Sequence, residues 1–157
     1  MQSVYGKERS MKRILVAVDG SEHSMKAVDT AAEMAAGGGA KLSLLAVVPS
    51  AAAMADELEV YARSEGLLKE LPRILASVQP TFLEPAAARA RAKKATDISL
   101  ETATGDAATE ILATARDVGV DMIVMGSRGR GRLRGLLLGS VSQKVAAHAP
   151  CSVLIVR

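Results

Sequence analysis

The chain has 157 residues, 49% of them hydrophobic and 24% charged, and a chain of this size can bury one core without disulfides or metals. Neither an apolar signal segment at the N-terminus nor a run of about 18 apolar residues is present, so the sequence favours neither export nor membrane insertion. The single cysteine, Cys151, cannot form an internal disulfide, which fits a reducing compartment. We therefore expect one cytoplasmic domain.

The positive charge is concentrated in one segment. The formal net charge is +3, and the four arginines at 128, 130, 132 and 134 exceed it on their own, so the rest of the chain is slightly acidic. Aromatic residues make up 2% of the chain, which argues against the stacking surfaces of single-strand nucleic-acid binders. A small anionic ligand explains the local charge better than nucleic acid does.

Short apolar segments predict the strands of a parallel sheet. Continuous apolar runs of this length are typical of strands that helices cover on both faces. A further segment, Asp97–Ala103, alternates apolar and polar residues, and we expect it to be half exposed at an edge of the sheet. The fold class is therefore α/β. The four buried strands are expected at 14–18, 42–48, 122–125 and 151–156.

Helical periodicity falls between these strands. Met25, Val28, Ala32 and Ala35 form one apolar face, and the glycines at 37–39 end this helix. A second helix is predicted to begin after Asp106 as N-cap and to end at Gly119. A third is predicted from Gly139 to Ala149, stopped by Pro150.

The segment between Pro49 and Lys94 is interrupted by three prolines. Its apolar spacing predicts a long helix and then a shorter one at Ala86–Lys94. The sequence leaves open whether Pro72 kinks the long helix or begins a new one.

The segment from Gly126 to Ser140 carries the predicted chemistry. It joins a buried strand to a helix, and in a parallel sheet such loops lie at the carboxyl ends of the strands, where ligands bind. Glycines there let backbone amides approach phosphate oxygens, and the helix start at Ser140 favours an anion. The spacing matches neither a P-loop nor the dinucleotide fingerprint. Arg128 is a candidate for phosphate contact, whereas Arg132 and Arg134 fit a solvated basic loop.

The spacing Gly126-x2-Gly129-x9-Gly139-Ser140 resembles the nucleotide-binding motif of the universal stress protein family. The segments 14–21, 121–126 and 148–156 are similar to the first, fourth and last strands of that family. The resemblance covers about residues 11–157, which leaves residues 1–10 as a flexible extension. The prolines between 49 and 94 depart from the family's pattern.

The resemblance implies a five-stranded parallel sheet in the order 3-2-1-4-5 with helices on both faces, a Rossmann-like fold, and a nucleotide between strands one and four. It also implies ATP, or AMP or ADP, as the ligand, Mg2+ held through the phosphates, and a homodimer through the last strand. Asp19 would bind adenine or ribose beside Ala17, with the backbone of Val47 on the adenine. The ribose and phosphates would meet Gly126, Gly129, Gly139, Ser140 and Val141, and Met125 and Arg128 complete the predicted site.

Several functions remain open at this point. The main hypothesis is a stress-response or signalling module in which the nucleotide sets the shape of the loop 128–138 and which acts on an unidentified downstream protein. A slow ATPase or nucleotidyl transferase is the rival, with Asp19, His23 and Ser140 as its best residues. A nucleotide-free adaptor and an RNA-binding loop are weaker readings. His23 and His148 fit surface or capping roles, and Ser21 can cap the first helix, which leaves Asp19 for the ligand.

Overall fold

The computed structural model describes residues 11–50, 80–129 and 138–157. These residues form a five-stranded sheet in the order β3-β2-β1-β4-β5, and all four neighbouring pairs run parallel. The predicted fold class and strand order are therefore confirmed. The strands are β1 (Arg13–Ala17), β2 (Lys41–Val48), β3 (Ile98–Thr104), β4 (Met122–Gly126) and β5 (Ser152–Val156).

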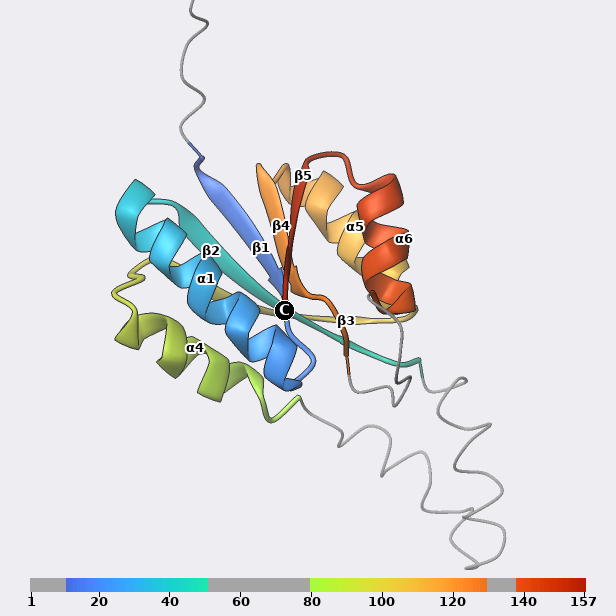
Figure 1. Cartoon of the computed structure of the whole chain (residues 1–157), viewed down its shortest axis with the longest axis horizontal. Helices are drawn as coiled ribbons and strands as arrows, with labels where there is room; N and C mark the ends of the chain where they lie inside the picture. Colours follow the sequence, from blue (N-terminus) through green and yellow to red (C-terminus); the bar gives the residue numbers. More distant parts are fainter. Residues whose placement is uncertain (1–10, 51–79, 130–137) are drawn as a thin grey trace, which may run out of the picture.

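Helices cover both faces of the sheet (Figure 1). Successive side chains of a strand point to opposite faces, so Ile14 and Val16 pack on one side and Leu15 on the other. Each face of the sheet therefore has its own apolar core. None of the described helices is long and apolar enough to cross a bilayer. One face carries α1 (Glu22–Gly38) and α4 (Leu83–Ala92), and the opposite face carries α5 (Ala107–Val118) and α6 (Ser140–His148).

The helix ends follow from local chemistry. The Ser21 side chain accepts a hydrogen bond from the Ser24 amide and caps α1, and Asp106 accepts one from the Thr109 amide at 3.0 Å and caps α5. Gly119 ends α5 with a φ of 64°, in the left-handed region that favours glycine. The predicted start and end of α5 are confirmed.

The half-exposed edge strand is also confirmed. β3 lies at one edge of the sheet, and its residues are partly or fully exposed. The start predicted for the short helix at Ala86 is wrong, because α4 already begins at Leu83. Pro85 is accommodated in the first turn, where its missing amide removes no helical hydrogen bond. The predicted long helix, the question about Pro72, and residues 1–10 fall largely or wholly outside the described residues.

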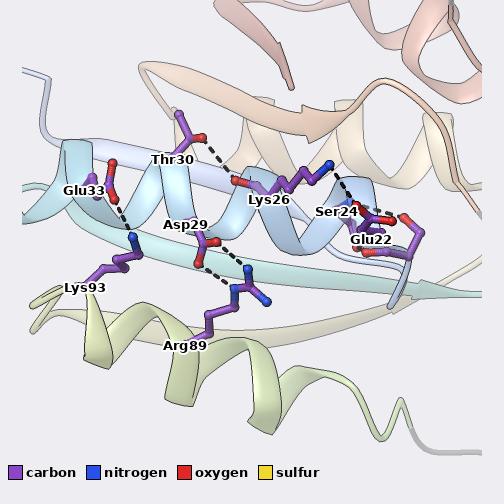
Figure 2. A network of polar contacts seen from close by, with 9 residues as sticks. Glu22, Ser24, Lys26, Asp29, Thr30, Glu33, Arg89 and Lys93 are labelled. Atoms are coloured by element: carbon purple, nitrogen blue, oxygen red, sulfur yellow. Dashed lines mark hydrogen bonds and ion pairs between the residues drawn. The ribbon is translucent and has the colours of Figure 1, made fainter. Parts of the chain in front are cut away.

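α4 packs on α1 through small residues framed by charges. Ala86, Ala87 and Ala90 are fully buried, which allows close helix packing. At the rim, the Arg89 guanidinium donates two hydrogen bonds to Asp29, 2.6 and 2.5 Å long, as Figure 2 shows. A second pair joins Lys93 Nζ and Glu33 Oε1 at 2.6 Å. The Arg89 hydrogen bonds lower the pKa of Asp29.

Candidate functional site

A cavity of about 260 Å³ opens at the carboxyl ends of β1, β2 and β4, beside the N-terminus of α6. Its volume is close to the lower end of the range for small-molecule sites, about 300 Å³. All the residues predicted to bind nucleotide line this one cavity. They are Ala17, Asp19, Val47, Met125, Gly126, Arg128, Gly129, Gly139, Ser140 and Val141.

Further residues line the cavity that sequence reasoning did not single out. Ile111 is one of the buried residues of α5, and it also lines the cavity. Ser142 lies in the first turn of α6, where a serine usually serves the helix end. The additional lining residues are Val18, Ser24, Leu45, Ala107, Ile111, Leu138 and Ser142.

Asp19 follows β1 and is held by the start of α1. Its Oδ1 accepts a hydrogen bond from the Ser21 amide at 2.9 Å, and its own amide donates to Ser24 Oγ at 3.4 Å. Because Ser21 Oγ accepts from the Ser24 amide at 3.2 Å, Ser21 caps α1, as expected. The second carboxylate oxygen of Asp19 faces Gly129, 2.5 Å from the position a Cβ would take there.

The structure explains the glycine at position 126 differently from the sequence. We expected glycine here to let amides approach a phosphate, but a Cβ at this position would lie 2.7 Å from the His23 carbonyl carbon and 2.9 Å from the Ser24 nitrogen. Both are backbone atoms at the start of α1, so they cannot move aside as a flexible side chain would. Gly126 therefore permits the close packing of α1 on the end of β4.

Ser127 joins the two ends of the glycine-rich segment. Ser127 is 1% exposed. Its carbonyl accepts hydrogen bonds from the Gly139 amide at 2.7 Å and from Ser142 Oγ at 3.1 Å. Its amide donates to the Val156 carbonyl of β5 at 2.7 Å. This junction brings the Gly126–Gly129 stretch beside the start of α6. The sequence carried no signal for it, since all these partners are distant along the chain.

The two histidines lie outside the cavity lining. His23 is half-buried, and its Nδ1 lies 3.3 Å from Ser127 Oγ. His148 is exposed at the end of α6, where its Nδ1 lies 2.9 Å from the Lys144 carbonyl, in a capping contact as predicted. Of the residues expected for an enzyme, Asp19 and Ser140 meet in the cavity and His23 does not.

The electrostatics near α6 favour an anion. Gly139, the N-cap, provides no side-chain hydrogen bond to the first turn, so the first amides of the helix are available to a ligand. Arg128 lies exposed at the cavity.

An ion pair links α6 to the start of α5, where Lys144 Nζ lies 3.1 Å from Asp106 Oδ1. The Asp106 pKa is lowered to about 2, first by hydrogen bonds from Thr109 and then by Lys144.

Within the described ranges, no three His, Cys, Asp or Glu side chains are grouped so that they would hold a metal ion. Asp19 is the single carboxylate among the described lining residues. A hard cation such as Mg2+ binds proteins through one or two carboxylates together with substrate phosphates. The site therefore fits Mg2+ only if a ligand supplies most of the oxygens.

Known proteins are similar to this chain in sequence and in fold. Universal stress protein YxiE of Bacillus subtilis is 40% identical over 147 residues, covering 92% of this chain and 98% of that protein. A crystal structure of a universal stress protein in complex with cAMP matches with a TM-score of 0.67 at 30% identity, covering 94% of this chain and 98% of that one. Universal stress protein UspA from Lactobacillus plantarum matches with a TM-score of 0.72 at 26% identity, with the same two coverages. The sequence model of the universal stress protein family matches residues 11–157, and this chain belongs to that family.

Proposed function

We propose that this protein binds an adenine nucleotide, ATP foremost, in the cavity and uses the bound state as a signal in a stress response. One observation carries the proposal: a single cavity joins an apolar wall, the carboxylate of Asp19 and the helix start at Ser140. These three environments match a base, a ribose and a phosphate chain. The related protein in complex with cAMP supports an adenine nucleotide as the ligand class.

The lining residues divide by chemistry. Ala17, Leu45, Val47 and Ile111 supply apolar surface for the adenine ring. Asp19 lines the cavity with its Oδ2 beside Gly129, and its carboxylate accepts hydrogen bonds from ribose hydroxyls.

The phosphates take the opposite end of the cavity. The backbone of Gly129, Ser140 and Val141 supplies amide donors, and the N-terminus of α6 adds a favourable dipole. Arg128 adds an exposed positive charge at the cavity. Mg2+, when bound, neutralises phosphate charge and takes its oxygens from the phosphates. Among the described lining residues, Asp19 has the one carboxylate that could contribute an oxygen to the ion.

Mass spectrometry of small molecules released from the purified, undialysed protein tests the ligand class. We expect an adenine nucleotide at a substantial fraction of the protein concentration, and calorimetry should give micromolar or tighter binding of ATP. Failure of ATP, ADP, AMP and cAMP to bind at millimolar concentration would reject the proposal.

The role of Asp19 is tested with two substitutions. Asp19→Ala removes the ribose acceptor and the partner of the Ser21 amide, whereas Asp19→Asn keeps an Oδ1 for that amide. A hydrogen bond to a charged group contributes about 1.5–3 kcal/mol, so both variants should lose about 10- to 150-fold in ATP affinity and keep their affinity for inorganic triphosphate. Equal losses for ATP and triphosphate would contradict a nucleoside contact.

We further propose a cytoplasmic homodimer that pairs through β5. This strand lies at the sheet edge, and its apolar residues Val153 and Ile155 are half-buried, so a partner strand would cover an exposed edge. Light scattering at micromolar concentration should give twice the monomer mass. Val153→Lys should give monomers with native circular dichroism, and a monomeric wild type would refute the pairing.

A further inference from the structure

We propose that the buried hydroxyl of Ser142 positions the phosphate-binding backbone, and that the preference for phosphorylated over unphosphorylated nucleosides depends on it. This inference rests on the proposed nucleotide function. Ser142 is 2% exposed and lies in the first turn of α6, at the edge of the cavity. It is a positioning residue, because its hydroxyl is engaged by the protein itself.

The hydroxyl spans the two ends of the glycine-rich segment. Its Oγ lies 2.8 Å from the Gly139 carbonyl and 3.1 Å from the Ser127 carbonyl. One hydrogen is thus shared between two acceptors that belong to opposite ends of the segment. The Gly139 amide donates a further hydrogen bond to the Ser127 carbonyl at 2.7 Å. The Ser127 carbonyl thus accepts from both the Gly139 amide and the Ser142 hydroxyl.

This convergence fixes the spacing of two predicted anion-binding stretches. Gly129 is two residues after Ser127, and Ser140 directly follows Gly139, so the bonds at Ser127 and Gly139 set how far apart their amides stand. A phosphate chain that contacts both stretches gains from amides held in place before binding. The adenine ring contacts the apolar wall of the cavity, and the affinity for adenosine, which has no phosphate, should not depend on this spacing.

Ser127 itself is held from two further sides. Its amide bonds to the Val156 carbonyl, and its hydroxyl lies 3.3 Å from His23 Nδ1. The Ser127 carbonyl therefore stays in place when the Ser142 hydroxyl is removed, and the change falls on the start of α6. This predicts an effect on ligand affinity greater than the effect on the fold.

The test compares Ser142→Ala with a matched control, Ser43→Ala. Ser43 is 3% exposed on β2, its Oγ lies 2.9 Å from Ser99 Oγ, and it does not line the cavity. Both variants lose one buried hydroxyl. Calorimetry measures the affinities for ATP and for adenosine, and thermal melting reports the fold.

Loss of one neutral hydrogen bond corresponds to about a two- to tenfold change. We expect Ser142→Ala to lower the ratio of ATP affinity to adenosine affinity by about that factor and Ser43→Ala to leave the ratio unchanged. Ser142→Thr, which keeps the hydroxyl, should show the same ratio as the wild type. Should Ser142→Ala fail to fold, Ser142→Cys, a weak donor of similar size, takes its place with the same expected loss.

An unchanged ratio in Ser142→Ala, or an equal fall in Ser43→Ala, would overturn the inference and leave nucleotide binding intact. A failed rescue by Ser142→Thr in a folded protein would also count against it. If the wild type binds neither ATP nor adenosine, the proposed function fails, and the positioning role fails with it.

Discussion

The carboxylate of Asp19 occupies the space that a side chain at position 129 would need. A Cβ on Gly129 would stand 2.5 Å from Asp19 Oδ2, well inside van der Waals contact. The segment after β1 and the segment after β4 are thus fitted to each other even before a ligand enters. Ser21 Oγ adds to this contact, lying 3.4 Å from the Arg128 carbonyl.

Gly129→Val should therefore displace Asp19 and abolish measurable ATP binding while the fold is kept. The overpacking is expected to cost about 1–3 kcal/mol of unfolding free energy, which urea denaturation measures, and calorimetry measures the loss of ATP affinity.

The double variant Asp19→Ala/Gly129→Val separates crowding from ligand contact. Removal of the carboxylate relieves the crowding but also removes the acceptor of the Ser21 amide, so stability should recover to that of Asp19→Ala alone, whereas ATP binding should stay lost. No recovery of stability in the double variant would show that Asp19 is not what a side chain at 129 displaces.

Gly126→Ala should destabilise the protein by more than Gly139→Ala does. A Cβ at Gly126 meets backbone atoms of His23 and Ser24 within 3 Å, while at Gly139 the nearest atom lies 3.5 Å away. We expect a cost of about 1–3 kcal/mol at position 126 and under about 1 kcal/mol at 139, where alanine is only a poorer N-cap. Urea denaturation measures both, and equal costs would contradict a packing role for Gly126.

Asp106 should give the protein an acid-sensitive contribution to stability. Its folded-state pKa is lowered from 3.8 to about 2, so the charged form stabilises the fold above about pH 4, and this contribution is lost as the pH falls toward 2. Asp106→Asn keeps the capping oxygen and removes the charge. The melting temperature of the wild type should exceed that of the variant at neutral pH, and the difference should vanish near pH 2.

Lys144→Met is the control for the source of this shift. The hydrogen bonds from Thr109 lower the pKa more than Lys144 does, so the Lys144 variant should keep most of the acid dependence. A complete loss of the pH dependence in Lys144→Met would assign the effect to the ion pair instead.

Ala90→Leu in α4 should destabilise the fold by about 1–3 kcal/mol, because the residue is fully buried against α1 and added volume must displace the helix. Arg89→Ala, on the same helix, removes the pair with Asp29 at the rim. The Arg89 side chain is 48% exposed, so its loss should cost under about 1 kcal/mol. Chemical denaturation measures the unfolding free energy of both variants. A larger loss in Arg89→Ala than in Ala90→Leu would contradict the prediction that packing contributes more here than the exposed ion pair.

The sheet and the cavity were predictable because short apolar runs and glycine spacing are local signals. The strand order followed from the family resemblance, and the residues named for the site, from Ala17 to Val141, meet in one cavity. The helix starts at Ser21 and Asp106 were readable because a capping side chain bonds three residues ahead.

The contacts between distant segments were not predictable. Nothing in the sequence relates Gly126 to His23, or Ser127 to Val156, because these pairs meet only after the sheet has formed. The start of α4 was missed for a different reason. A proline usually interrupts a helix, and Pro85 lies in the one turn where it does not.

The bond from the Ser127 amide to the Val156 carbonyl has a practical consequence for the choice of fusion site. All strands of the sheet run in one direction. β1 therefore begins at the end of the sheet opposite the cavity, whereas β5 ends on the same side as the cavity. A purification tag or fluorescent reporter joined before Met11 would therefore be attached at the end of β1 that lies away from the proposed nucleotide site. The same reporter joined directly after Val156 would begin beside the carbonyl that accepts the Ser127 hydrogen bond, and deletion of Val156 would remove that carbonyl.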